Sequence, residues 1–216
     1  MSVAELCETC QSVTATKDIR RALMEAAARL LAEQGPQALT TRRLAAEVGT
    51  STMAVYTHFG GMEELRRAIR EDGFARLERE WAGVEQMNDP VADLSVSGAT
   101  YVAFALANPN LYRAMLLESR IDNADLAASS IGGPQLAILT RCMDAGRFDR
   151  TDPAALLWQL WAATHGVVSG VLAGVLDIAM GIEQLAALGL SLYVGFGDER
   201  PAARASLERA RARIAQ

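Results

Sequence analysis

Apolar residues recur at steps of three and four positions through most of the chain, which is the spacing of amphipathic helices. The clearest case is residues 17–34, where apolar side chains alternate with Arg and Glu. This pattern stops at Gly35 and Pro36, two residue types that end helices. The sequence therefore predicts a first helix over residues 17–34, preceded by a flexible leader at residues 1–16.

Two short helices are predicted next, over residues 40–47 and 51–58. Thr40 is a suitable N-cap for the first of them, and Gly49 stands where the chain must turn between the two. A longer helix follows over residues 62–85, after a pair of glycines. The close spacing of these elements predicts a small three-helix bundle at the N-terminal end.

The second half of the chain is richer in apolar residues and is punctuated by Asn-Pro, Gly-Gly-Pro and Asp-Pro. These signals predict further helices over residues 90–107, 109–118, 134–146, 153–175 and 179–196. Residues 122–133 are expected to form a loop. The Arg-rich end, residues 199–216, is expected to be a charged tail or solvated helix.

Composition agrees with a helical protein. Apolar residues make up 50% of the 216 positions, but aromatic residues only 6%, and helix formers such as Ala and Leu dominate. We therefore expect an all-α fold with an N-terminal three-helix bundle over residues 17–61. A larger helical domain is expected over residues 62–198.

The chain has neither a run of about eighteen uninterrupted apolar residues nor a basic start followed by an apolar segment. The longest apolar candidate, residues 154–180, is interrupted by Gln159, His165 and Asp177 among others. These patterns favour a cytoplasmic protein without a membrane partner.

Cysteine and histidine usage argues against a metal site. Cys7 and Cys10 form a C-x-x-C pair, but no second pair at zinc spacing accompanies it, so a flexible tail is the simpler interpretation. The chain has only two histidines, which is too few for a histidine triad. Paired carboxylates, a Ser/His/Asp set and a phosphate loop are also missing from the sequence patterns. We expect no cofactor, no catalytic residue and no enzymatic activity.

The net charge of −5 is distributed unevenly along the chain. Residues 12–60 carry six Lys or Arg and four acidic residues, so this segment has a charge of +2, whereas the remainder is negative. Local positive charge attracts phosphate groups. The segment with the two short helices is therefore the one suited to nucleic acid.

Two short helices joined by a tight turn also match the helix-turn-helix, whose second helix enters the major groove of DNA. Ala54, Val55 and Phe59 are expected to pack inward. The opposite face carries polar and aromatic residues without an obvious role in a core. The predicted DNA contacts are Thr40, Thr41, Arg42, Arg43, Ser51, Thr52, Met53, Tyr56, Thr57 and His58. A surface helical hairpin with chance polarity is the competing interpretation.

Residues 17–69 resemble the tetracycline-repressor (TetR) family of transcriptional regulators. The resemblance rests on LTTRRLA at residues 39–45, VYTHF at residues 55–59 and EEL at residues 63–65, with Val-Gly between the short helices. It implies that Thr41 and Arg42 contact DNA from the first helix and Thr52 and Met53 contact bases. Tyr56 and His58 match positions that contact phosphate.

One residue departs from the family pattern. The family usually has a Lys just before the acidic pair at residues 63–64, where it contacts phosphate, and this chain has Met62. The N-terminus of the following helix can still offer backbone N–H groups to a phosphate. We therefore expect one ionic contact fewer.

The C-terminal region resembles a TetR subgroup whose effector domain carries a Trp and a His-Gly pair, here at Trp161 and His165. A pocket for a small effector is predicted, although Trp and Met at helical spacing are also typical of an ordinary core. The candidate lining residues are Tyr101, Phe104, Met115, Cys142, Trp158, Trp161 and His165.

The resemblance implies a ligand-responsive transcriptional regulator, most simply a repressor. It would bind a palindromic double-stranded DNA operator as a homodimer and be released by a small-molecule effector. A constitutive helical DNA-binding protein without an effector is the main alternative, and a helical enzyme is the weaker one. The sequence does not name the effector, the operator or the regulated genes.

Overall fold

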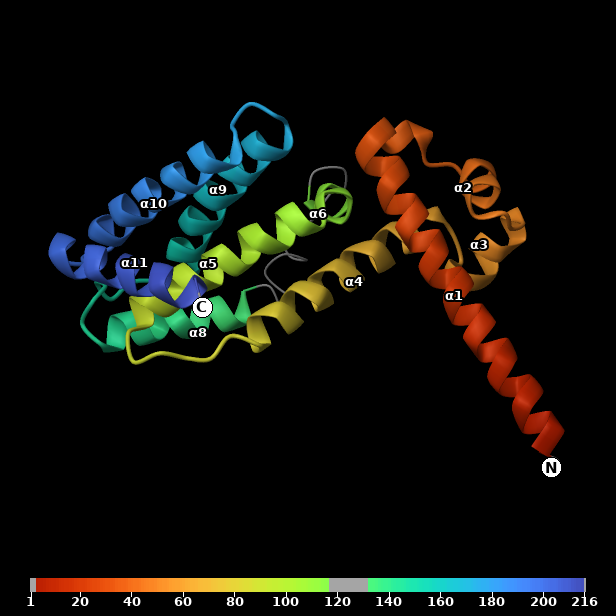
Figure 1. Ribbon diagram of the computed structural model, residues 1–216, viewed down its shortest axis with the longest axis horizontal. Helices are drawn as coiled ribbons and strands as arrows, with labels where there is room; N and C mark the ends of the chain where they lie inside the picture. Colours follow the sequence, from red (N-terminus) through yellow and green to blue (C-terminus); the bar gives the residue numbers. More distant parts are fainter. Residues whose placement is uncertain (1–2, 117–131, 216) are drawn as a thin grey trace. The chain divides into compact units, whose positions relative to one another are not determined.

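The computed structural model describes residues 3–116 and 132–215, and all regular structure in these ranges is helical (Figure 1). This confirms the all-α prediction. The N-terminal elements are α1 (Val3–Gln34), the 3-10 turn η1 (Pro36–Ala38), α2 (Thr41–Val48), α3 (Thr52–Phe59) and α4 (Met62–Ala82). They are followed by α5 (Pro90–Ala107), α6 (Pro109–Leu116), α8 (Gly133–Asp144), α9 (Pro153–Leu172), α10 (Ile178–Gly195) and α11 (Arg200–Ile214).

Most predicted boundaries agree with the structure to within a few residues, but the first helix does not. The backbone is helical from Val3, whereas the periodic pattern predicted a start at residue 17. Apolar periodicity marks the part of a helix that packs on something, so it does not reveal where the backbone helix begins. The predicted loop at residues 122–133 lies mostly outside the described residues.

The described chain divides into two compact units. One contains the residues up to Gly73 together with α6, and the other contains Phe74–Asn108 and the residues from 132 onward. Helix α4 is continuous across this division. The units differ from the predicted domains in two ways, because the first turns of α4 and all of α6 group with the N-terminal helices.

The core of the N-terminal unit joins α1, α2, α3 and α4. Leu23, Leu44, Val55 and Leu65, one from each helix, have no exposed surface. Ala114 of α6 is part of the same cluster, since α6 packs along α1. Burial of each large side chain of this kind stabilises the fold by about 1.5–3 kcal/mol.

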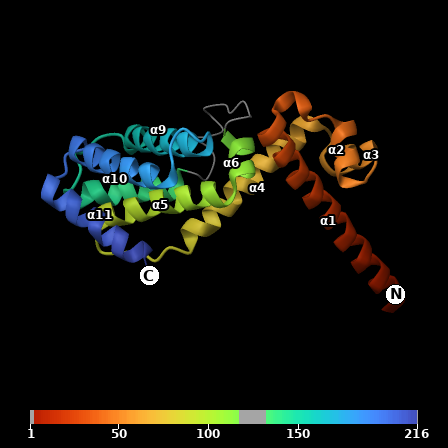
Figure 2. The ribbon, with the colours of Figure 1, turned by 45° about the horizontal axis from the view of Figure 1, so that its top comes forward.

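Helix α5 is the centre of the C-terminal unit and packs against α8, α9 and α11. Figures 1 and 2 both show α10 beside α9 and α11 beside α5, as the contacts between these pairs require. The core includes Val91, Leu139, Phe148 and Tyr193, all buried. The turn between α9 and α10 uses Gly174 in the left-handed region, with a φ of 73°.

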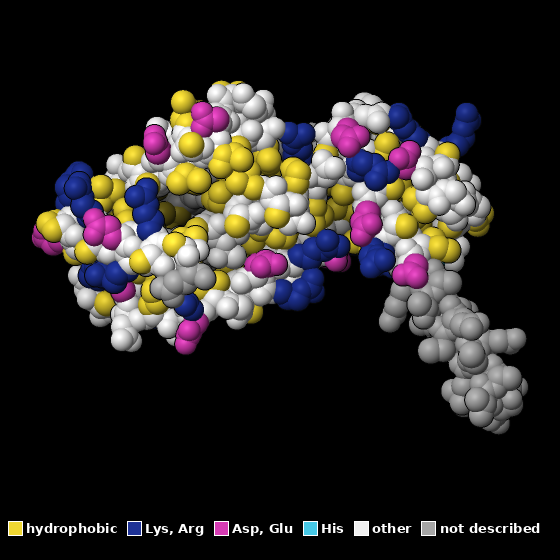
Figure 3. All heavy atoms as spheres, in the orientation of Figure 1, with side chains coloured by type: hydrophobic (Ala, Val, Ile, Leu, Met, Phe, Trp, Pro, Cys, Tyr) yellow, Lys and Arg dark blue, Asp and Glu magenta, His cyan; other side chains and the backbone are white. Residues whose placement is uncertain are grey.

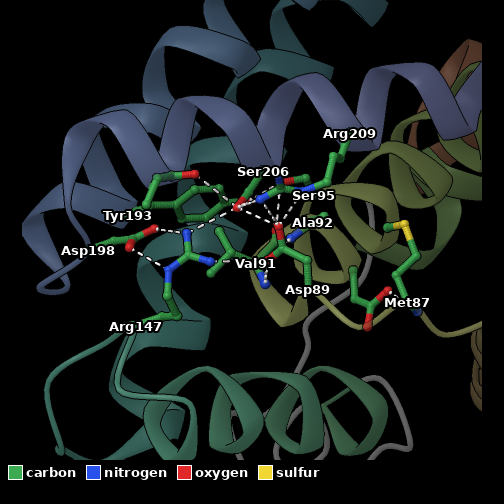
Figure 4. Close-up of polar contacts among 12 residues, drawn as sticks. Met87, Asp89, Val91, Ala92, Ser95, Arg147, Tyr193, Asp198, Ser206 and Arg209 are labelled. Carbon is green, nitrogen blue, oxygen red and sulfur yellow. Dashed lines mark hydrogen bonds and ion pairs between the residues drawn. The ribbon is translucent and has the colours of Figure 1, made fainter.

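The C-terminal segment is a packed helix and not a free tail. Ala203, Ser206 and Ala210 of α11 are buried against the unit, while its arginines lie on the outer side or form ion pairs. Ser206 donates to Asp89 Oδ2 at 2.7 Å, and Arg209 Nε donates to the same oxygen at 2.8 Å (Figure 4). Arg147 bridges this cluster to Asp198 through two hydrogen bonds of 2.7 Å each.

Three helices are long and apolar enough to span a membrane by length and composition alone: α5, α9 and α10. None of the three contains an uninterrupted apolar run of eighteen residues, because single polar residues interrupt it. These single residues lower the mean hydropathy of each helix only slightly. Helix α5 is enclosed by its neighbours, whereas α9 and α10 keep apolar side chains exposed, and Figure 3 shows hydrophobic side chains on the surface of this unit.

Candidate DNA-binding site

Helix α2 is fixed at both ends by local signals. The Thr40 hydroxyl accepts a hydrogen bond from the backbone N–H of Arg43 at 3.3 Å, as an N-cap does. Gly49 ends the helix in the left-handed conformation with a φ of 70°, which a side chain at this position would strain. Leu44 and Ala45 anchor the inner face of the helix in the core.

Helix α3 begins in the same manner. The Ser51 hydroxyl accepts from the N–H of Ala54 at 3.3 Å, and Gly60 ends the helix with a φ of 81°. Val55 and Phe59 are buried, as predicted for the inward face, and Ala54 is half-buried. Two short helices held by these caps and a shared core form a helix-turn-helix.

The outer face of α3 carries large side chains that the core does not use. Met53 is 66% exposed and Tyr56 is 50% exposed, and Thr52 and Thr57 are also exposed. Exposed apolar and aromatic side chains on a capped, rigid helix are suited to contacts with base edges and thymine methyl groups. Thr40 and Ser51 act as caps through their side chains, so a DNA contact from either would be additional to that role.

The two arginines of α2 have different surroundings. Arg43 donates to the side-chain oxygen of Gln34, whereas exposed Arg42 makes no hydrogen bond or ion pair with the described residues. Arg29 and Glu47 form a separate ion pair of 2.6 Å between α1 and α2. Arg42 is therefore the more available of the two for a base or a phosphate, and Thr41 beside it is half-buried.

His58 lies at the last turn of α3 and is half-buried. Its ring meets Phe59 edge to face at a centroid distance of 6.4 Å. On the same phenyl ring, the Arg20 guanidinium lies 4.9 Å from the centroid. Arg20 is a neighbour of the site that sequence reasoning did not single out, because only the packing of α1 on α3 brings it there.

An acidic side chain lies beside the N-terminus of α4. Gly61 directly precedes the helix, and a Cβ atom there would lie 2.9 Å from Glu64 Oε2. The Glu64 carboxylate therefore folds back over the first turn, where a negative charge is stabilised by the helix dipole. The sequence predicted one ionic phosphate contact fewer because Met62 replaces the Lys of the family. The structure adds that a carboxylate lies near this position.

The predicted effector residues fall into three groups. Trp158, Trp161 and His165 come together on α9: the two indoles meet edge to face at 5.7 Å, and Trp161 stacks on His165 at 4.6 Å with an interplanar angle of 15°. Tyr101, Phe104 and Cys142 are buried in the C-terminal unit. Met115 is buried in the other unit, where its side chain packs on the backbone of Gly73.

The pKa shifts of Cys142 and His165 both favour the neutral form. Burial raises the pKa of the Cys142 thiol to about 12, and it lowers the pKa of His165. Both groups are therefore neutral near pH 7. Within the described residues, three or more His, Cys, Asp or Glu side chains do not gather in a way that could hold a metal ion.

Two family models match the chain in sequence order. Residues 23–69 match "Bacterial regulatory proteins, tetR family", and residues 94–193 match "Tetracyclin repressor-like, C-terminal domain". The first match covers the helix-turn-helix and the second covers most of the C-terminal unit.

Similar proteins agree with these models. An uncharacterized HTH-type transcriptional regulator of Mycobacterium tuberculosis, Rv0681, is 32% identical over 165 residues, which cover 73% of this chain and 72% of that protein. A protein of unknown function from Rhodococcus sp. RHA1 is 27% identical with a TM-score of 0.65, and the match covers 83% of this chain and 96% of that structure.

RolR, solved in complex with the ligand resorcinol, shares the fold with a TM-score of 0.64 at 18% identity, over 91% of this chain and 96% of that structure. Both halves of the chain and their order along it thus match one class of protein, with the helix-turn-helix at its N-terminal end. The chain belongs to the TetR family of transcriptional regulators.

Proposed function

We propose that the protein is a homodimeric repressor that binds a palindromic operator and releases it when a small-molecule effector binds. The observation that carries this proposal is the outer face of α3, where Met53 and Tyr56 are exposed on a helix capped and packed as a recognition helix. Exposure of this kind has no structural benefit in the chain alone. It is explained by DNA contacts in a major groove.

The face of α9 and α10 supports the homodimer. Ile178, Met180 and Ile182 are 56%, 46% and 52% exposed, and Trp158 and Leu188 are also exposed. Pairing these two helices with those of a second copy would form a four-helix interface and cover the apolar face. A membrane surface is the competing occupant of the same face, and the oligomeric state in solution distinguishes the two.

The aromatic cluster of α9 supports an effector site in the C-terminal unit. A stacked Trp161 and His165 with a neutral imidazole offer an apolar, uncharged surface with polar atoms at its edge. The fold is known to accept a small ligand, since RolR was solved with resorcinol. The effector of this chain need not be the same compound.

Release of DNA would follow from a shift between two arrangements of the dimer. An effector that prefers the arrangement in which the two recognition helices do not match successive major grooves lowers operator affinity. A coupling free energy of about 1–3 kcal/mol corresponds to a roughly five- to 150-fold loss. Such a protein works in the cytoplasm, in contact with the chromosome.

Selection of genomic fragments by the purified protein tests the proposal. We expect enrichment of sites with two inverted half-sites, bound by two copies of the chain. Enriched fragments without symmetry, bound by single chains, would contradict the homodimer. A failure to enrich any fragment over bulk DNA would contradict the repressor function itself.

A further inference from the structure

Three buried polar atoms in the C-terminal unit make no hydrogen bond with any described residue: Gln135 Oε1, Trp161 Nε1 and Ser169 Oγ. Gln135 stands out among them, because the residue as a whole is only 7% exposed. A buried polar atom left without a partner costs about 1–3 kcal/mol, and folded proteins pair nearly all of them. The amide oxygen of Gln135 is therefore available to accept a hydrogen bond from a bound molecule.

The nitrogen side of the same amide is firmly held. Gln135 Nε2 donates to Ser97 Oγ at 3.0 Å, which connects the first turn of α8 to α5. The carbonyl oxygen of Ser97 in turn accepts from Trp81 Nε1 at 3.0 Å, so the end of α4 is attached to the same residue. The amide is thus positioned by neighbours on one side only.

Two glycines lie close along the chain to the Gln135–Ser97 hydrogen bond, Gly98 after Ser97 and Gly132 before Gln135. A Cβ atom at Gly98, the partly buried residue after Ser97, would meet no heavy atom within 4 Å. On the other side, Gly132 approaches Leu157 of α9 to 3.4 Å, measured from its ideal Cβ position. Trp161, with its unpaired indole N–H, lies one helical turn after Leu157.

Among the described residues of this unit, the buried carboxylates are already paired with arginines. Arg141 pairs with Asp93 at 2.7 Å, and Arg147 pairs with Asp198 at 2.7 Å. The atoms that still lack partners belong to an amide, an indole and a hydroxyl, all of them uncharged. A charged ligand would enter this interior without a counter-charge, at a large desolvation cost.

We propose that Gln135 binds the effector through its free amide atom, and that the effector is an uncharged molecule with a hydroxyl group. A hydroxyl group donates to an amide oxygen and accepts from an indole N–H. It would also pair with the amide if the Gln135 oxygen and nitrogen exchanged places, so the class of ligand does not depend on the amide orientation. This inference rests on the proposed function, because it identifies the effector class of the proposed regulator.

Calorimetric titration of the full-length protein with matched compounds tests the inference. The probes are phenol, resorcinol and 2-naphthol, each compared with its methyl ether, and 2-naphthoate as a charged relative. We expect at least one hydroxyl compound to bind roughly tenfold more tightly than its ether, the effect of one hydrogen bond to a buried group. The Gln135→Met variant should remove this difference, while Gln159→Met, at an exposed glutamine of α9, should retain it.

The outcomes separate a ligand contact from a structural role. If Gln135 only supports the fold, its substitution weakens binding of the hydroxyl compound and of the ether by the same factor, and this result would overturn the inference. The inference would also be overturned if the wild-type protein bound each hydroxyl compound and its ether equally, preferred 2-naphthoate, or bound none of the probes. Should Gln135→Met not fold, Gln135→Asn withdraws the amide by one methylene and is expected to reduce the same difference. Selection of genomic fragments tests operator binding separately. If operator fragments are enriched but the calorimetric titrations give one of the contradicting results, only the inference about Gln135 fails and the proposed function stands.

Discussion

At the scale of single residues, the site contains two kinds of side chain: those that cap or anchor the helices, and exposed ones that have no structural role in the chain. Thr40 and Ser51 cap α2 and α3, and Val55 and Phe59 anchor α3 in the core. Arg42, Met53 and Tyr56 have no such task. Residues of the second kind are the ones whose replacement should change DNA binding without changing the fold.

Arg42→Ala should weaken binding to the selected operator by about 1–3 kcal/mol, with relaxed preference at one base pair, if the guanidinium binds a guanine. Fluorescence anisotropy titrations with the operator and with variants at each position measure both effects. Arg79→Ala, at an exposed arginine in the last turn of α4, is the control and should bind as the wild type does. Equal binding by Arg42→Ala and wild type would remove Arg42 from the interface.

Met62→Lys should strengthen DNA binding, since it restores a cation at the start of α4 beside the Glu64 carboxylate. Each added phosphate contact steepens the plot of log affinity against log salt concentration by about 0.9. The measurement is operator affinity over a series of salt concentrations. Ala82→Lys, at the exposed end of the same helix, is the control and should leave the slope unchanged. If Met62→Lys also leaves the slope unchanged, no phosphate lies near residue 62.

At the scale of elements, sequence patterns correctly predicted helices that have capping residues and a buried apolar face. They did not predict how a helix packs when its contacts come from residues far away in the chain. The turn from α2 to α3 follows from Thr40, Gly49 and Ser51, all of them local signals. The docking of α11 depends on Arg209 and Asp89, which are 120 residues apart. An Arg-rich helix gives no sign of such a partner in its own sequence, so the sequence predicted a charged tail or a solvated helix.

The Asp89 cluster predicts a pH dependence of stability. Burial alone would raise the pKa of Asp89, but hydrogen bonds from Ser206, Arg209 and the Ala92 backbone outweigh it and lower the pKa. A carboxylate whose pKa is lower in the folded state stabilises the fold above its unfolded pKa, near 4, and this contribution is lost as the pH falls through the folded value.

Asp89→Asn should therefore reduce the free energy of unfolding at pH 7 by about 1–3 kcal/mol, and the difference from wild type should shrink below pH 4. Urea denaturation followed by circular dichroism at pH 7 and pH 3 measures it. Asp144→Asn is the control, because that carboxylate pairs with Arg150 at an exposed position. A difference that is the same at both pH values would mean that the Asp89 charge contributes nothing.

At the scale of the whole molecule, the apolar faces of α9 and α10 remain exposed to solvent in a single chain. Ile182→Glu places a charge at a side chain that is 52% exposed, so the monomer loses little packing. We expect the wild type to be a dimer and Ile182→Glu a monomer in analytical ultracentrifugation, with at least tenfold weaker operator binding. Ile214→Glu, at a similarly exposed isoleucine of α11, should remain a dimer.

A wild-type protein that is monomeric and sediments with lipid vesicles would instead assign this face to a membrane. The sequence patterns predicted no membrane partner, because single polar residues interrupt the apolar spans. They also could not predict the grouping of α6 with α1, which depends on contacts between segments far apart in the chain.

The central claim is that the exposed face of α3 reads DNA. Equilibrium titration of the selected operator with the Met53→Ala/Tyr56→Ala double variant tests it most directly, beside an Ile214→Ala control at an exposed apolar position of α11. We predict that the α3 variant keeps the wild-type melting temperature and loses operator affinity by at least tenfold, while the control binds normally. Wild-type operator affinity in the α3 variant would contradict the account.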